Sequence, residues 1–476
     1  MIVKRVVFII LIVFFVHYTF SQNKQVLFGF NDIPQSTLIN PSTTLDNDWF
    51  MGFPLLSHVH FNFGSSNATA FDLFADDGRD FNTKLQSLVF RLDNKDFYTS
   101  SQQLEIFTGG FSFGNGIEKD RYLSFGMYVE TDVIAYHPRD YVILAYEGNA
   151  SNIGKVFDLS DLNVSGEMVS VLHVGVTKKI NDKLTIGARG KIYNSILNLN
   201  STKNSGSFIT REGHDNLLEH TFNLDLKVNT SGISSLASDD NSDVSNDIKT
   251  LRRRLLLGGN LGLGLDFGAT YQPTDQWTVE ASLQDFGFIR HKKDVEAYAV
   301  KGNFVYEGIN PLFPEVEDGQ TAEDYWNEVA DNFEELFEVD TTTTKYTTWR
   351  PLKFNAAVRY AFGEKKAKDC NCLADDVGYL NAVGAQLYAI NRPKAPQLAL
   401  TAFYYRRIFE GLRVKATYTV DSFSFYNVGL GVSTQLGALN LYLMADNLLD
   451  YQNLAKAQSV SFQFGMNLVF GRGEKQ

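Results

Sequence analysis

The stretch SVSFQFGMNLVF, residues 459–470, decides the fold. From Val460 onward every second residue is apolar, and the residues between are Ser, Gln, Gly or Asn, with Val469 as the exception. Successive side chains of a β-strand point to opposite faces, so the segment predicts one apolar face and one small, polar face. A tilted strand of about 9–11 residues is long enough to cross a membrane. We therefore interpret this segment as a membrane-spanning strand.

The same alternation recurs along the chain and predicts an all-β fold, a transmembrane antiparallel β-barrel. Residues 260–271 and 277–284 form the clearest pair of strands. We expect about 14–16 strands, depending on whether Gly206–Arg211 and its neighbour belong to the wall. Short turns are expected at one end of the barrel, at 181–182, 273–276, 410–411 and 437–438, and long inserts, some helical, at the other, at 65–101, 137–164, 231–256 and 291–349.

A soluble β-sandwich or barrel would show a similar alternation. The faces opposite the apolar ones, however, carry many charges, and a soluble core tolerates buried charges only when they are paired. In a membrane barrel these side chains would face a wet lumen, where they could pair, anchor a plug or line a passage. The candidate lumen-lining residues are Glu130, Arg189, Lys191, Asp225, Lys227, Asp266, Glu280, Lys353, Arg359, Arg413 and Lys415.

The N-terminus has the features of a secretory signal peptide. Lys4 and Arg5 precede an apolar run that ends near Phe20, and Ser21 is a small residue suited to cleavage. A membrane anchor is the alternative, but the run is short for a spanning helix, which needs about 20 apolar residues. We interpret residues 1–21 as the signal peptide, which predicts export to the bacterial outer membrane, with its lipid as a partner.

The sequence divides further into an N-terminal hatch or plug segment, residues 22–50, and the barrel, residues 51–476. Pro34 and Pro41 make a central strand in the first of these segments improbable, and a simple linker is the alternative. The chain has a net charge of −12, which argues against nucleic acid as a partner. Aromatic residues make up 13% of the chain, as interfacial girdles require.

Motifs for chemistry are few, and we expect no enzyme activity, cofactor or metal. Cys370 and Cys372 are the only cysteines and form a structural pair, a disulfide in an oxidising compartment, or a redox pair. The G-x-S-x-G match at 110–114 lies within an alternating segment and not at a strand-to-helix turn, which disfavours a nucleophile elbow. His58 and His60 share a strand face, but no third metal ligand is indicated.

Several segments together resemble an uncharacterised outer-membrane barrel family of the Bacteroidota. They are Ser21-Gln22, GFNDIPQSTLINPS at 29–42, GFPLL at 52–56, PRDYVILAYEGN at 138–149, DNLLD at 446–450 and FQFGMNLVFG at 462–471. More distantly, the chain resembles FadL-type fatty-acid channels and related barrels of type IX secretion. The resemblance implies a 14-stranded wall with an N-terminal hatch, and it assigns no functional residue.

Two functions of different class follow from these interpretations. The first is a FadL-like channel for a small, and in one version hydrophobic, solute. The second is a non-enzymatic structural component or partner of secretion, gliding or adhesion machinery, with the external loops and an amphipathic acidic helix at 321–337 as the contact surface. The sequence does not distinguish the two.

Overall fold

A computed structural model describes residues 24–114, 119–213, 218–237, 244–307, 337, 339–364, 378–409, 411–423 and 425–471. The expected signal peptide, the acidic helix at 321–337 except for Phe337, and the pair Cys370 and Cys372 lie outside the described residues. Among the residues described, no helix has both the length and the apolar character that crossing a membrane requires.

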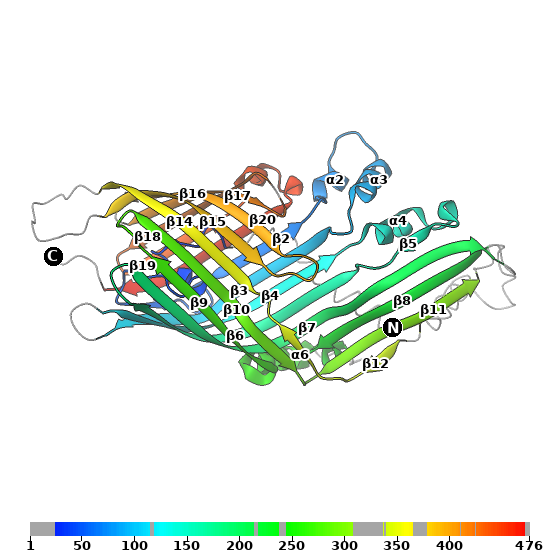
Figure 1. Cartoon of the computed structure of the whole chain (residues 1–476), viewed down its shortest axis with the longest axis horizontal. Helices are drawn as coiled ribbons and strands as arrows, with labels where there is room; N and C mark the ends of the chain where they lie inside the picture. The colour runs from blue at the N-terminus through cyan, green and yellow to red at the C-terminus, as the bar shows by residue number, and fades with distance from the viewer. Residues whose placement is uncertain are drawn as a thin grey trace, which may run out of the picture.

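The fold is a closed antiparallel β-barrel of 14 strands (Figure 1). Each wall strand pairs with its chain neighbours in the wall, and the last strand pairs with the first. The wall strands are β1 (Trp49–Gly52) with β2 (Val59–Ser65) as one interrupted strand, β3 (Phe97–Phe113), β4 (Arg121–Tyr136), β6 (Asn163–Lys179), β7 (Leu184–Glu212), β9 (Asn260–Tyr271), β10 (Trp277–His291), β14 (Lys353–Glu364), β15 (Tyr379–Ile390), β16 (Gln397–Phe409), β17 (Leu412–Asp421), β18 (Asn427–Leu436), β19 (Leu439–Ala445) and β20 (Ser459–Phe470).

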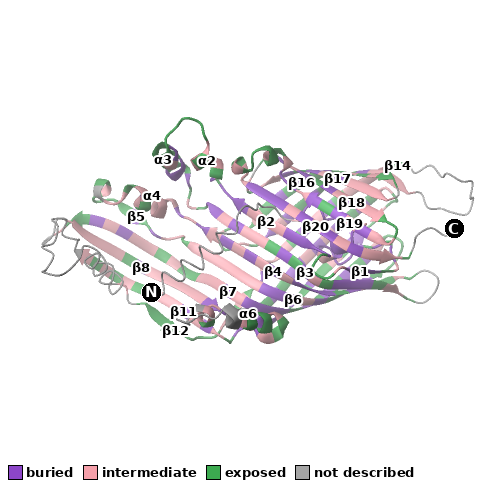
Figure 2. Ribbon diagram, turned by 180° about the vertical axis from the view of Figure 1, so that it is seen from behind, coloured by how far each residue is buried: buried purple, intermediate pink, exposed green. Residues whose placement is uncertain are grey.

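The two faces of the wall are reversed relative to a soluble protein. On β9, Leu261, Leu263 and Leu265 are 50%, 60% and 45% exposed, whereas Asp266 on the opposite face is fully buried. The polar face of β20 is likewise buried, including Gln463 and Asn467. Figure 2 shows this alternation of buried and exposed residues along the wall strands. The predicted transmembrane barrel, with its apolar face outward, is confirmed.

The two ends of the barrel differ as expected. At one end, here called the turn end, β6–β7, β9–β10 and β18–β19 are joined by a few residues each. The other end, called the loop end, carries the four long inserts. They contain the helices and helical turns α2 (Ala70–Phe74), α3 (Phe81–Arg91), α4 (Arg139–Glu147), η2 (Ala150–Asn152), α5 (Ser234–Ala237), α6 (Val244–Arg253) and η3 (Arg254–Gly258), while η4 (Leu448–Gln452) and η5 (Leu454–Lys456) follow β19 at the same end.

A second sheet continues from the wall at the loop end (Figure 1). β7 extends past its last pair with β9 and there pairs with β8 (Leu218–Ser231), which pairs with β11 (Val295–Glu307). The short strands β5 (Val156–Asp158), β12 (Asp340–Thr342) and β13 (Tyr346–Trp349) pair with β7, β11 and β10 respectively. Gly206–Arg211 is therefore the upper part of β7 and not a separate wall strand, which settles the strand number at the lower value of the expected range.

A polar clasp at the base of this second sheet holds the segment that carries α6. Arg254 forms an ion pair with Asp294 at 2.7 Å, and Ser235 Oγ donates a hydrogen bond to the same carboxylate at 2.7 Å. Burial would raise the pKa of Asp294, but hydrogen bonds from Ser234 and Ser235 and the charge of Arg254 outweigh it, so this pKa is lowered.

The clasp predicts a pH dependence. Because the folded-state pKa of Asp294 lies below its ordinary value of about 3.9, the stabilisation is complete above that value and is lost as pH falls through the folded-state pKa. Amide hydrogen exchange at 252–257, corrected for its intrinsic pH dependence, is expected to accelerate below about pH 4. Asp294→Asn should show the faster exchange already at pH 7; slow exchange in this variant would contradict the clasp.

The reversed wall predicts the effect of a charge on its outer face. Leu265→Arg is expected to lower the free energy of unfolding by about 2–4 kcal/mol, because the side chain lies near the middle of β9 and faces lipid. The measurement is denaturant unfolding of the barrel in phospholipid vesicles. Leu454→Arg, in the loop-end turn η5, is the control and should change stability by about 0.5 kcal/mol or less. Equal losses in the two variants would show that Leu265 does not contact lipid.

Candidate functional site

The lumen is occupied by the N-terminal segment, residues 24–47, here called the plug. Its apolar side chains Val26, Leu27, Phe28, Phe30 and Ile33 are at most 1% exposed. They pack against one another and against wall residues that face inward, namely Ala357 of β14, Tyr405 of β16, and Tyr442 and Met444 of β19. The segment therefore forms a small apolar core inside a polar lumen, with a single turn η1 (Pro34–Leu38) at its centre.

Charged wall residues hold one side of the plug. Arg413 forms an ion pair with Asp32 at 2.8 Å, and the hydroxyl of Tyr405 donates to the same carboxylate at 2.5 Å. Lys415 Nζ donates to the carbonyl oxygen of Phe28 at 2.5 Å. Such charge-assisted bonds are stronger than neutral ones, so these contacts fix the first half of the plug against β16 and β17.

Other wall strands hold the second half of the plug. Gln35 and Asn467 of β20 exchange amide hydrogen bonds at 2.8 and 2.9 Å, and Gln35 Nε2 also donates to Glu105 of β3 at 3.0 Å. Arg189 of β7 donates to the carbonyl oxygen of Leu38 at 3.1 Å, and Ser282 of β10 donates to that of Ile39 at 2.8 Å. The plug is thus bonded to strands around much of the wall.

Two wall glycines make room for the end of the plug. A Cβ atom on Gly187 would lie 2.0 Å from the carbonyl oxygen of Pro41, and one on Gly268 would lie 2.8 Å from the backbone nitrogen of Ser42. Real Cβ atoms do not approach other atoms so closely, so any larger residue would displace the plug. Gly187 and Gly268 are register partners on β7 and β9, which makes this one shared contact.

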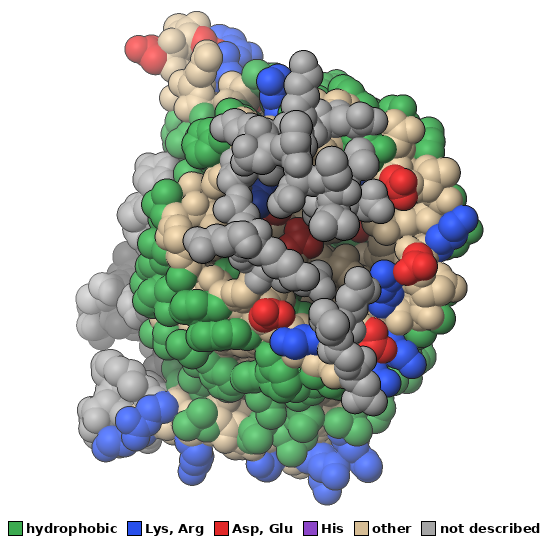
Figure 3. All heavy atoms as spheres, turned by 90° about the vertical axis from the view of Figure 1, so that its left-hand side faces the viewer, with side chains coloured by type: hydrophobic (Ala, Val, Ile, Leu, Met, Phe, Trp, Pro, Cys, Tyr) green, Lys and Arg blue, Asp and Glu red, His purple; other side chains and the backbone are tan. Residues whose placement is uncertain are grey.

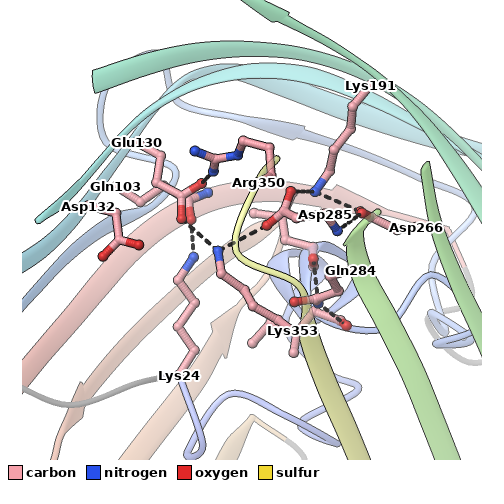
Figure 4. Close-up of polar contacts among 12 residues, drawn as sticks. Lys24, Gln103, Glu130, Asp132, Lys191, Asp266, Gln284, Asp285, Arg350 and Lys353 are labelled. Carbon is pink, nitrogen blue, oxygen red and sulfur yellow. Dashed lines mark hydrogen bonds and ion pairs between the residues drawn. The ribbon is translucent and has the colours of Figure 1, made fainter. Parts of the chain in front are cut away.

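A continuous chain of ion pairs crosses the lumen beside the plug, and Figure 4 shows its middle part, from Asp266 to Arg350. The members of this ion-pair chain are buried, except Lys353 and Glu167, which are part-buried, and bases and acids alternate, so the formal charges cancel. The pairs are Arg189–Asp266 at 3.3 Å, Asp266–Lys191 at 2.9 Å, Lys191–Asp285 at 2.7 Å, Asp285–Lys353 at 3.0 Å, Lys353–Glu130 at 2.7 Å, Glu130–Arg350 at 2.7 Å, and Arg350–Glu167. Because an unpaired buried charge is costly, this alternation is what makes so many charges compatible with burial.

The structure brings most of the candidate lumen residues into two groups. Glu130, Arg189, Lys191, Asp266 and Lys353 belong to the ion-pair chain. Glu280, Arg359, Arg413 and Lys415 lie on β10, β14 and β17 toward the plug, and a Cβ on Gly29 of the plug would lie 3.1 Å from Glu280 Oε2.

Asp225 and Lys227 are placed elsewhere. They lie on β8, which pairs with the upper part of β7 and with β11, outside the closed wall. Asp225 forms a part-exposed ion pair with Lys203 at 3.2 Å. The alternation of residues 221–230 is the same as that of a wall strand, so the pattern alone does not separate the second sheet from the barrel.

Three members of the ion-pair chain were not among the sequence candidates. Asp285 lies at a register shift between Leu283 and Phe286, with φ of +60°, so the period of two that points to lumen residues is broken there. Arg350 follows β13 and precedes β14, outside any regular alternation. Glu167 is the register partner of Asp132 across β4 and β6, and only the strand pairing shows that it faces the lumen.

Two small cavities lie in the loop-end half of the lumen. The first, of about 50 Å³, is lined by Lys24 and Gln25 of the plug and by wall residues that include Glu130, Lys353 and Arg392. The second, of about 40 Å³, extends toward Asp421, Ser422 and Phe423 at the loop end. The two share the lining residues Gln25, Asn62, Tyr388, Ile390 and Arg392.

Polar groups in the first cavity are left without a protein partner. Within the described residues, Asn355 Nδ2 and Asn62 Oδ1 make no hydrogen bond, although both residues line the cavity. Asn355 is 2% exposed. Buried amides are almost always hydrogen-bonded, so these atoms are available to water or to a polar solute.

The other sequence motifs carry no site in the described residues. His58 is hydrogen-bonded through Nδ1 to the hydroxyl of Tyr442 at 2.6 Å, and Ser112 lies inside β3 and donates to Asp48 at 3.1 Å. In the described part of the chain, no cluster of three or more His, Cys, Asp and Glu side chains is arranged to hold a metal ion.

Comparison with known proteins identifies the family. DUF5723, described as a family of unknown function, matches residues 41–446. The chain belongs to the DUF5723 family. No curated protein matches the sequence significantly.

Several solved barrels are similar in outline to this DUF5723 chain. The toluene transporter TbuX of Ralstonia pickettii has a TM-score of 0.41 at 10% identity, over 92% of this chain and 94% of that one. A FadL homologue of Pseudomonas aeruginosa has a TM-score of 0.39 at 10% identity over the same shares of the two chains. The toluene transporter TodX of Pseudomonas putida has a TM-score of 0.38 at 9% identity, over 95% of this chain and 98% of that one. Similarity at this level transfers no function.

The ion-pair chain predicts a large effect of removing one buried acid. Asp285→Asn leaves Lys191 and Lys353 with one carboxylate partner each instead of two. Breaking a buried ion pair in this way costs about 3–5 kcal/mol. We expect that loss in the free energy of unfolding, measured in vesicles. Asp225→Asn removes a part-exposed pair and should cost about 0–1 kcal/mol. If Asp285→Asn proved as mild as its control, the chain of ion pairs would not be a stabilising element.

Proposed function

We propose that this chain is an outer-membrane channel whose plug closes the lumen and whose loop end admits a small polar solute. The observation that carries the proposal is the polar first cavity beside the plug, which adjoins the second cavity toward the loop end. Its lining combines acids, bases and amides, and it includes amide atoms that lack a protein partner. A polar solute could satisfy those atoms, whereas a hydrocarbon would leave them unpaired at a cost.

The outer-membrane location is part of this proposal. It is supported by the exposed apolar faces of the wall strands, by short turns at one end and long inserts at the other, and by the signal peptide expected from the sequence. In such barrels the short turns are periplasmic and the long loops are external. The loop-end cavities would then face the cell exterior, and the plug would connect to the first wall strand at the periplasmic end.

A structural role in secretion, gliding or adhesion machinery is the second candidate. The second sheet favours it, because β7, β8 and β11 extend beyond the barrel and have an apolar core of their own. That core contains Val89 of α3, Ile143 of α4, Phe157 of β5, Phe208 of β7 and Leu224 of β8. A rigid platform of this kind is suited to contact with another protein, and nothing in passive transport requires it.

The channel proposal predicts that loosening the plug increases uptake. Asp32→Ala combined with Gln35→Ala removes the ion pair to Arg413 and the bonds to Asn467 and Glu105, and leaves the wall unchanged. Losing contacts worth a few kcal/mol should raise the open population, and therefore the rate, by about tenfold or more. The measurement is swelling of proteoliposomes in small sugars and zwitterionic amino acids.

The control is Asp182→Ala combined with Asp275→Ala, two turn-end residues outside the lumen, which should leave the rate unchanged. Folding of each variant is checked by the shift in gel mobility on heating. No uptake through either the wild type or the loosened plug, with both folded, would contradict the channel and leave the structural role. Faster uptake of an aromatic hydrocarbon than of polar solutes would contradict the solute class.

A further inference from the structure

A helical segment lies against the outer face of the wall near the loop end. Ser170 Oγ of β6 donates to the carbonyl oxygen of Leu255 at 2.9 Å, and the backbone nitrogen of Gly259 donates to Asn194 Oδ1 of β7 at 2.8 Å. Ser170 and Asn194 belong to the outward face, since Val174 and Ile192 on the same faces are 51% and 39% exposed. The turn η3 therefore covers Ser170 and Asn194, the outward-facing residues of β6 and β7 on the loop-end side of the exposed apolar surface.

Strand register defines the edge of that apolar surface. One row across β7, β9, β10 and β13 consists of the register partners Ile192, Leu263, Phe288 and Trp349, all outward and all 39–69% exposed. The next outward row toward the loop end contains Asn194, Leu261, Arg290 and Thr347. Within two residues, about 7 Å along a strand, the surface thus changes from a wholly apolar row to a row whose only apolar member is Leu261. Trp349, at 69% exposure, lies on the boundary, where tryptophan is enriched in membrane proteins.

Exposed basic side chains gather just beyond this boundary. We call them the basic rim, and they come from α6, from β10 and the residues after it, and from the residue before β13. The basic rim consists of Lys249, Arg252, Arg253, Arg290, Lys292, Lys293 and Lys345. Figure 3, which looks at the molecule from the turn end, shows Lys and Arg side chains along the lower edge, the side of the barrel on which α6 lies in Figure 1.

Among the described residues, the acids near the basic rim are fewer than its seven bases, and one of them, Asp247, lies on α6 itself. Asp294 is paired with Arg254 in the clasp, and Glu296 accepts a hydrogen bond from Tyr298. Asp340, the first residue of β12, is a further exposed acid among the described residues next to this region. The basic rim therefore carries an excess of positive charge at one depth of the barrel.

We propose that the basic rim binds the phosphate groups of an outer-leaflet lipid whose headgroup carries two phosphates. In the segment 249–257, α6 ends at Arg253 and the backbone of Leu256 and Leu257 is non-helical. The exposed bases Arg252 and Arg253 are followed directly by these two leucines, which are 68% and 46% exposed. Such a segment places its leucines among acyl chains and its bases at the level of the headgroups. Phosphate is the anion found at that depth, and each basic residue near an anionic lipid surface contributes to binding.

Lipid is a better occupant of this surface than a protein partner because the rim is continuous with the lipid-facing row. Leu261 and Leu263 of β9 follow Leu256 and Leu257 closely in the chain, and all four side chains are 46–68% exposed. The clasp through Arg254, together with the hydrogen bond that Lys293 Nζ donates to the carbonyl oxygen of Gly258 at 3.0 Å, ties η3 to the residues that follow β10. The proposal depends on the outer-membrane location and is independent of any transport through the lumen.

The test uses the full barrel in phosphatidylethanolamine nanodiscs with diphosphoryl lipid A as the probe, and bound lipid is counted by native mass spectrometry. The rim variant is Arg252→Gln, Arg253→Gln, Arg290→Gln and Lys292→Gln together. Its matched control is Lys178→Gln, Lys179→Gln, Lys183→Gln and Arg406→Gln, four exposed bases of the turn-end half of the barrel. The wild type and the control should bind the lipid about tenfold or more tightly than the rim variant, and the difference should shrink at high salt.

Lipid A with both phosphates removed should bind the wild type as weakly as the diphosphoryl lipid binds the rim variant. Equal binding of the two lipids by the wild type, or undiminished binding of diphosphoryl lipid A by a folded rim variant, would overturn the proposal. Tight binding of phosphatidylglycerol equal to that of diphosphoryl lipid A would also overturn it, since the headgroup would then need only one phosphate. Solute uptake by the rim variant should equal that of the wild type, so a failure of the channel proposal would be recognised separately.

Discussion

The hydrogen bonding between β20 and the first wall strand is the contact on which the molecule depends. Trp49 pairs with Phe470 and Val59 with Phe464, so the sheet closes and no wall edge is left to lipid. Backbone groups that cannot reach water must be bonded within the protein, and only a closed sheet meets this condition with strands. Closure also separates two environments, and everything in the lumen follows from being enclosed. Charges placed there have to find partners across the bore or on the plug.

Much of the barrel could be predicted from the sequence because alternation and turn residues are local signals. The outward leucines of β9 and the buried amides of β20 are the residues that the pattern assigned to each face, and the turns at 181–182 and 437–438 fixed which end is which. The second sheet could not be predicted. A period of two continues unbroken when β7 leaves the wall, and only the change of its partner from β9 to β8 marks the point.

The lumen site was partly accessible from sequence for the same reason. Glu130, Lys191 and Asp266 lie in regular strands, so their inward direction follows from their neighbours. Asp285 and Arg350 lie at a register shift and between two strands, where periodicity gives no direction. The pairing of one charge with another depends on distances across the barrel, which the order of residues along the chain does not contain. Residues 22–50 were expected to form a hatch or plug segment, and the many bonds of the plug to the wall are a property of the folded protein alone.

The alternating order of the ion-pair chain has a consequence for what the lumen can distinguish. Each acid except the terminal Glu167 lies between two bases, so the ion-pair chain itself presents opposed dipoles and no net charge. The electrostatic potential of the ion-pair chain falls off steeply with distance, and its sign changes from one charged side chain to the next. A molecule beside it would be sorted by its shape and by the direction of its own dipole, with little preference for cations over anions.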